Sequence, residues 1–193
     1  MSISILIPNH NEENISLMMS ETERIFPDAE IVVCTDRYSR GKGWSLRQAM
    51  LHCSNDVVCF IDGDLDIHPR MIKRLIPFLE DYDIVLGKKQ IRSRLSRRIL
   101  THLSRLYIRT LFGLSFDTQT GIKLFKKSVV PYWEANSYAF DIEVIGRAHA
   151  LGIPIIEVPV EVTPEGKSSK PMKLKNIIKA LKESFKIWVS LKL

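Results

Sequence analysis

The chain has 193 residues, 45% of them hydrophobic, and a formal net charge of +6 from 28 Lys and Arg against 22 Asp and Glu. This length suffices for one substantial core and is short for two independent domains, and the charge favours anionic partners such as phosphates, nucleic acid or an acidic membrane surface. The three cysteines form no C-x-x-C pair, which argues against a disulfide framework or a zinc site and favours a reducing cytoplasm. No apolar run reaches the roughly 18 residues of a spanning helix, and the start of the chain turns polar too quickly for a signal peptide.

In the first half of the chain, short apolar runs alternate with segments of helical spacing. The expected strands cover residues 3–7, 31–34, 57–61 and 84–87, and the expected helices cover residues 13–26, 43–53 and 69–79. Runs that are apolar throughout are typical of strands buried on both faces, and their alternation with helices predicts an α/β domain with a mostly parallel, Rossmann-like sheet. Ligands of such sheets bind beyond the carboxyl ends of the strands. We therefore expect the site within residues 8–12, 36–43 and 62–66.

The second half contains two amphipathic helices. The spacing predicts a long helix over residues 94–112 with an arginine-rich face, then a loop and strand over 117–125, a helix over 141–151 and a strand over 155–162. A polar segment follows, and a second amphipathic helix begins at Leu174. Its apolar face either packs on the domain or lies on an anionic membrane, so we expect a domain over residues 1–170 and a terminal helix over 171–193.

The most informative stretch is Asp62-Gly63-Asp64-Leu65-Asp66, which places three carboxylates directly after an apolar strand. Burying them unpaired would be very costly. Grouped carboxylates beside a glycine suit a hard divalent cation such as Mg²⁺ or Mn²⁺ that is also held by a diphosphate. An exposed acidic turn is the alternative for the isolated motif, whereas an EF-hand loop is excluded because Ile67 and Lys73 replace its glycine and glutamate.

Polar segments after the first two strands are further candidates. Pro8, Asn9, Asn11 and Glu12 follow the first strand, where amide and carboxylate groups could bind a nucleobase and ribose; a turn before a helix is the alternative. Asp36 ends the second strand and could contact the base or ribose, or serve only as a turn residue.

Lys42 lies between Gly41 and Gly43. This segment could direct a cation and a nest of backbone amides at phosphate, although it lacks the Walker A frame.

Several segments in order resemble the family 2 glycosyltransferases of GT-A fold, and within them the dolichyl- or polyprenyl-phosphate sugar synthases. These segments are I-P-N-H-N-E-E, I-V-V-C-T-D, G-K-G-W-S-L, I-D-G-D-L-D, L-F-G-L-S-F-D-T-Q-T-G-I-K-L-F, Y-A-F-D-I-E-V and I-I-E-V-P-V-E-V. The resemblance implies that Pro8, Asn11, Glu12 and Asp36 bind the nucleotide. It also implies that Asp62 contacts nucleotide or metal, and that Asp64 and Asp66 hold the metal, although Asp66 stands where the family often has Gln.

The resemblance further implies inverting transfer of a hexose from a nucleotide diphosphate sugar, of GDP-mannose or UDP-glucose type, to a polyprenyl or dolichyl phosphate. Arg97 or Arg98 aligns with a family arginine before the long helix, and Glu143 with a family acid that faces the donor sugar. Thr163 replaces an arginine expected to clamp the acceptor phosphate, so Lys167 or Lys170 is the candidate substitute. For Glu143 a buried ion pair is the alternative, and Asp141 is the other candidate for binding sugar hydroxyls.

Two rival functions remain open at this point. A basic nucleic-acid-binding α/β protein would explain the charge, but it gives no reason for three carboxylates at one strand end, so we expect no nucleic-acid partner. A family 2 transferase with a soluble or glycan hydroxyl acceptor would need a carboxylate base. With a lipid acceptor, we expect the protein to lie peripherally on the cytoplasmic face of a membrane.

Overall fold

The computed structural model describes residues 2–9, 13–89, 106–137, 139–162 and 174–192. The strands are β1 (Ile3–Asn9), β2 (Glu30–Thr35), β3 (Val57–Ile61), β4 (Ile84–Lys89), β5 (Ile122–Lys126) and β6 (Ile155–Val160). The helices are α1 (Ile15–Ile25), α2 (Lys42–Met50), α3 (Met71–Leu75), α5 (Phe140–Ala150) and α6 (Leu174–Lys192), with 3-10 turns at Ile76–Leu79 and Lys127–Val129. The expected α/β fold with a terminal amphipathic helix is confirmed.

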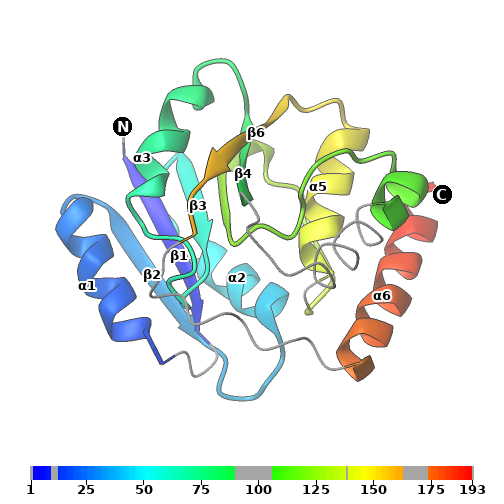
Figure 1. The fold of residues 1–193 in the computed structure, drawn as a ribbon, viewed down its shortest axis with the longest axis horizontal. Coiled ribbons are helices and arrows are strands. Elements are labelled where there is room, and N and C mark those ends of the chain that lie inside the picture. The colour runs from blue at the N-terminus through cyan, green and yellow to red at the C-terminus, as the bar shows by residue number, and fades with distance from the viewer. Residues whose placement is uncertain (1, 10–12, 90–105, 138, 163–173, 193) are drawn as a thin grey trace.

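The six strands form one sheet in the order β2-β1-β3-β5-β4-β6 (Figure 1). β1 pairs in parallel with β2 and β3, and β4 pairs in parallel with β6. β5 is antiparallel to both β3 and β4. The start of β5 therefore lies at the same edge of the sheet as the carboxyl ends of its neighbours.

Alternate residues of the strands build two cores, one on each face of the sheet. On one face, Ile5 and Cys59 pack with Met18 of α1 and Ile72 of α3. On the other face, Leu6, Val58 and Phe60 pack with Leu46 of α2 and with Phe140 and Ile145 of α5. Because both faces are covered, the strands are apolar throughout, as the sequence indicated.

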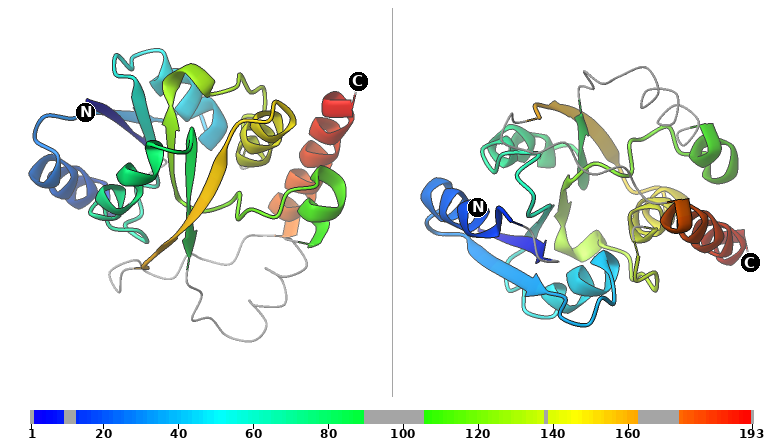
Figure 2. Two further views of the ribbon diagram at one scale, coloured as in Figure 1. Left: turned by 90° about the horizontal axis from the view of Figure 1, so that it is seen from above. Right: turned by 60° about the horizontal axis from the view of Figure 1, so that its bottom comes forward.

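The terminal helix α6 packs on the outer side of α5, away from the sheet (Figures 1 and 2). Ser184 and Ile187 of α6 are buried, and Ser184 Oγ lies 3.0 Å from the Tyr107 hydroxyl. Tyr107 belongs to a helical segment over residues 106–112, which is the described part of the long helix expected from residue 94. None of the described helices is long and apolar enough to span a bilayer.

Candidate active site

Four charged side chains of alternating sign form a chain at the carboxyl edge of the sheet. Lys42 Nζ, at the start of α2, lies 2.7 Å from Asp62 Oδ1 and 3.8 Å from Asp141 Oδ2. Lys123 Nζ, on β5, lies 2.6 Å from Asp141 Oδ1 and donates to the Thr120 carbonyl at 2.6 Å. Asp141 and Lys123 are almost completely buried, whereas Asp62 keeps about a third of its side-chain surface exposed. The exposed end of this chain is therefore the Asp62 carboxylate.

The acidic motif continues from Asp62 through a left-handed turn at Leu65. Leu65 has a φ of 60° and is buried, a conformation that costs a non-glycine residue about 1–2 kcal/mol. The turn lets the Asp66 amide donate to Asp64 Oδ1 at 3.0 Å, while Asp66 Oδ2 pairs with Lys89 Nζ at 3.2 Å. The turn thus holds Asp64 and Asp66 close together.

The carboxylates of this motif differ in their electrostatic surroundings. Burial opposes ionisation of Asp62, but the nearby charges of Lys42, Lys123 and Lys89 hold its pKa below the ordinary value. Burial, together with the negative charges of Asp62 and Asp66, raises the pKa of Asp64. Negative charge at Asp64 is therefore less well compensated by the protein than negative charge at Asp62.

Two glycines allow close packing around the acidic motif, because a side chain at either position would crowd its neighbours. A Cβ on Gly121, at the start of β5, would lie 2.7 Å from Asp62 Oδ2. A Cβ on Gly63 would lie 3.1 Å from the Ile15 side chain and 3.5 Å from the Pro8 carbonyl. Pro8, Lys42, Gly121 and Lys123 lie around Asp62 with almost no free space between them. The backbone at Gly121 therefore packs directly against the Asp62 carboxylate, and the backbone at Gly63 packs against Ile15 and Pro8.

Two further residues expected to bind the nucleotide lie at the ends of β1 and β2. Asn9 Nδ2 donates to Thr35 Oγ1 at 3.2 Å, which links the ends of the two strands. Asp36 is buried, and its Oδ2 accepts from the Gly41 amide at 2.6 Å. Asp36 therefore holds the turn that leads into α2. Asn11 and Glu12 lie outside the described residues.

Most backbone amides of the Gly41-Lys42-Gly43 segment already have partners within the protein. The Gly43 and Trp44 amides donate to the Asn136 carbonyl at 2.9 and 3.3 Å, and the Gly41 amide is taken by Asp36. These donors are occupied by the protein itself, so Lys42 brings a side-chain cation to the site without a backbone cradle.

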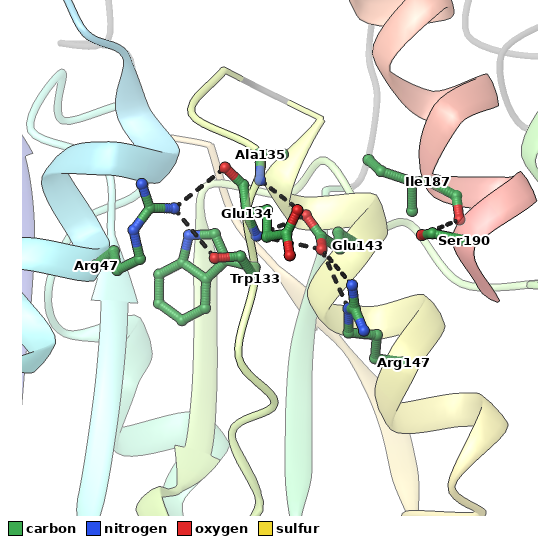
Figure 3. Close-up of polar contacts among 8 residues, drawn as sticks. All are labelled: Arg47, Trp133, Glu134, Ala135, Glu143, Arg147, Ile187 and Ser190. Atoms are coloured by element: carbon green, nitrogen blue, oxygen red, sulfur yellow. Dashed lines mark hydrogen bonds and ion pairs between the residues drawn. The ribbon is translucent and has the colours of Figure 1, made fainter.

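Glu143 faces a neighbouring loop. Its two carboxylate oxygens accept from the backbone amides of Glu134 and Ala135 at 2.9–3.2 Å, and its Oε1 lies 2.8 Å from Arg147 Nη2 (Figure 3). Asp141 lies two residues before Glu143 on α5 and instead contacts Lys42 and Lys123. Among the described residues, Asp141 is therefore the acid of α5 that contacts the lysines Lys42 and Lys123. The contacts of Glu143 are instead those of the buried-ion-pair alternative.

The region around the end of β4 and the start of β5 is only partly described. Lys88 Nζ pairs with Glu157 Oε2 at 2.6 Å, and Glu157 also accepts from the Asp117 amide. The Thr120 hydroxyl is buried and has no hydrogen-bond partner within the described segments. The candidate cations Arg97, Arg98, Lys167 and Lys170 lie outside the described residues, as does Thr163.

Sequence reasoning missed Lys123. The available signal was a lysine between Ile122 and Leu124 in an otherwise apolar run, since a buried lysine requires a charged partner. That partner, Asp141, is 18 positions away in the sequence, and only the fold brings the two together.

No group of three His, Cys, Asp or Glu side chains converges as a ready metal site within the described ranges. The donor chemistry of the acidic motif nevertheless suits a hard cation, because Asp64 and Asp66 offer carboxylate oxygens held together by one turn. Such a cation would also offset the poorly compensated charge at Asp64.

Residues 2–169 match the sequence model described as "Glycosyltransferase like family 2". Over 83% of both chains, the protein is 23% identical to an undecaprenyl-phosphate mannosyltransferase of Micrococcus luteus. It is 26% identical to a dolichyl-phosphate beta-glucosyltransferase of Dictyostelium discoideum, over 82% of this chain and 54% of that enzyme. The chain thus spans about half the length of the second relative.

A solved structure with a similar fold is glucosyl-3-phosphoglycerate synthase from Mycobacterium tuberculosis, in complex with Mn²⁺, UDP and phosphoglyceric acid. The two folds superpose with a TM-score of 0.77 at 19% identity, over 98% of this chain and 78% of the other. This likeness establishes the expected GT-A fold.

Proposed function

This chain belongs to glycosyltransferase family 2, and from that premise we propose that it transfers a hexose from a nucleotide diphosphate sugar to a polyprenyl or dolichyl phosphate. The observation that carries the proposal is the acidic motif at the carboxyl edge of the sheet, with Asp62 bound to Lys42 and Asp66 bound to Lys89. The two relatives named above act on undecaprenyl and dolichyl phosphates by their names, which supports the lipid phosphate as acceptor.

The donor diphosphate lies against the acidic motif in this proposal. Asp64 and Asp66, with Asp62, hold Mg²⁺ or Mn²⁺, which would neutralise the departing diphosphate. Lys42 adds a positive charge next to Asp62, and Lys89 adds one next to Asp66. Pro8, Asn9, Asn11, Glu12 and Asp36 bind the nucleoside at the ends of β1 and β2.

The acceptor needs little acid–base help. A phosphate monoester has a second pKa of about 6 and is already anionic near neutral pH, so it attacks the anomeric carbon without a strong base. Asp141 is bound by two lysines and Glu143 by two amides and an arginine, which leaves neither acid suited to removing a proton. As far as these two acids of α5 are concerned, the arrangement fits a phosphate acceptor, which needs no strong base, better than a hydroxyl acceptor. Arg97 and Lys170 are the cations proposed to gather the acceptor phosphate.

Substitution of Asp64 tests the donor site. We expect Asp64→Ala to abolish Mn²⁺-dependent binding of UDP or GDP, measured by titration calorimetry, because it removes one of the three carboxylates proposed to hold the metal. The matched control is Asp81→Ala, an exposed acid far from the motif in sequence, which should bind as the unaltered chain does. Undiminished binding by Asp64→Ala would refute the site.

The outer face of α6 supports peripheral membrane contact. Leu181, Phe185 and Val189 recur every fourth residue and are each more than a third exposed, so they form one apolar stripe. Lys182 and Lys186 are exposed beside it. An apolar stripe flanked by lysines suits the interface of an anionic bilayer.

Vesicle sedimentation tests this contact. We expect the protein to pellet with vesicles rich in phosphatidylglycerol and not with neutral vesicles, and Phe185→Ser to weaken pelleting several-fold. Leu151→Ser is the control, because Leu151 is equally apolar and 72% exposed but lies at the end of α5. Equal loss in both variants would contradict a role for α6.

A further inference from the structure

The loop over residues 133–137 lies on the N-terminal end of α2. Its Asn136 carbonyl accepts from the Gly43 and Trp44 amides, and the Trp133 indole Nε1 donates to the Gly43 carbonyl at 2.9 Å. α2 has no side-chain cap of its own, since Gly41 occupies the N-cap position. The loop therefore supplies the cap of the helix that begins with Lys42.

The fit between loop and helix is close. A Cβ on Gly41 would lie 2.3 Å from the Asn136 carbonyl oxygen, and a Cβ on Gly43 would lie 2.3 Å from the Ala135 carbonyl oxygen. Both clashes are with backbone, so no side-chain movement would relieve them. The start of α2 and the loop are thus fixed relative to each other.

The loop is held from two sides (Figure 3). On the α2 side, Arg47 donates to the carbonyls of Trp133 and Glu134 at 3.1 and 3.3 Å. On the α5 side, Glu143 accepts from the Glu134 and Ala135 amides. Glu143 is 2% exposed and is itself fixed by Arg147. A buried carboxylate that holds two successive amides determines the path of the loop at this point.

We propose that Glu143 is a positioning residue, which acts through the loop and the start of α2 on Lys42. Lys42 is the first residue of α2 and, among the described residues, the cation closest to Asp62, at 2.7 Å. Loss of the Glu143 contacts frees the loop, removes the cap of α2 and lets Lys42 leave its place. This inference rests on the proposed function in one respect, which is that Lys42 contributes to binding of the donor diphosphate.

A double-mutant cycle tests the route through Lys42. The probe is UDP or GDP, whichever the unaltered chain binds more tightly in Mn²⁺, with affinity measured by calorimetry. We expect Glu143→Ala and Lys42→Ala each to weaken binding about tenfold, and the double variant to be no more than about twofold weaker than Lys42→Ala alone, because both changes remove one effect. Effects that multiply would overturn the proposal.

Glu143→Gln keeps the size of the side chain and an oxygen for the loop, and guards against a variant that does not fold. It should retain most of the affinity lost in Glu143→Ala. Asp83→Ala is the control for general loss of stability, since it breaks an ion pair of 2.7 Å with Lys126 far from the loop. We expect Asp83→Ala to leave nucleotide affinity unchanged, and an equal weakening there would overturn the proposal.

Amide hydrogen exchange tests the same link without any nucleotide. We expect Glu143→Ala to speed exchange at Gly43 and Trp44, whose amides depend on the loop carbonyl, while the amides in the middle of β3 stay protected. Unchanged exchange at Gly43 and Trp44 overturns the inference even if the enzyme binds nucleotide. If the unaltered chain binds neither UDP nor GDP, the proposed function fails and the exchange result alone decides this inference.

Discussion

At the scale of single residues, the charged chain is anchored by one buried ion pair, between Lys123 and Asp141. Burial lowers the pKa of Lys123, while the charge of Asp141 acts in the opposite direction. Removing one member of a buried ion pair leaves the other charge uncompensated, which is far more costly than the net worth of the pair. The pair thus fixes Asp141 where it can also attract Lys42.

We expect Lys123→Met to lower the free energy of unfolding by about 3–5 kcal/mol, because it leaves the buried Asp141 carboxylate with only the more distant Lys42, at 3.8 Å, as a described cationic partner. Lys126 provides a matched control on the same strand, since it pairs with Asp83 at 2.7 Å but is 38% exposed. Lys126→Met should cost about 0–1 kcal/mol. Urea unfolding measures both, and equal costs in the two variants would contradict the importance of burial.

At the scale of single elements, the sequence was most informative where a segment is apolar throughout or strictly amphipathic. The strands β1, β3 and β4 and the helices α1 and α6 were all expected near their observed positions. The direction of β5 was not predicted, because pairing with β3 and β4 depends on residues far apart in the chain. The cap of α2 was missed for the same reason, since it is a carbonyl of a loop more than 90 residues later.

Glu30 links three elements at the edge of the sheet opposite the site. Its carboxylate accepts from the Ser4 hydroxyl on β1 and from the amide and hydroxyl of Ser54, at 2.8 and 3.0 Å. The hydrogen bond from Ser4 is the main cause that holds the pKa of Glu30 below its ordinary value. A carboxyl group with a lowered pKa in the folded state stabilises the protein above the pKa of the unfolded state, and this contribution disappears as the pH falls through the folded-state value.

We therefore expect Glu30→Gln to lower the free energy of unfolding by about 1–2 kcal/mol at pH 7. The difference from the unaltered chain should shrink as the pH falls below about 4.5 and vanish once Glu30 is protonated in both states. Chemical denaturation at a series of pH values measures this. A difference that stays constant down to pH 3 would show that the charge of Glu30 is not responsible.

At the scale of the whole molecule, the sheet brings together residues whose chemistry the sequence could suggest one at a time. The order of motifs indicated the family, which the family match confirms. It also indicated the carboxyl edge of the sheet as the site, and that remains a prediction. Which side chains share a contact could not be predicted, because Lys42, Asp62, Lys123 and Asp141 come from four separate elements or their ends. Glu143 illustrates what sequence alone could not predict. Its position in a motif suggested contact with the donor sugar, whereas its observed hydrogen bonds hold the loop over residues 133–137.

Transfer of label to lipid tests the central claim most directly. The protein is incubated with radiolabelled GDP-mannose or UDP-glucose, a polyprenyl phosphate and Mn²⁺, and the mixture is extracted with organic solvent. The predicted result is label in the organic phase that requires both the polyprenyl phosphate and the metal and is lost in Asp64→Ala. Label found only in a water-soluble product would contradict the lipid-phosphate acceptor.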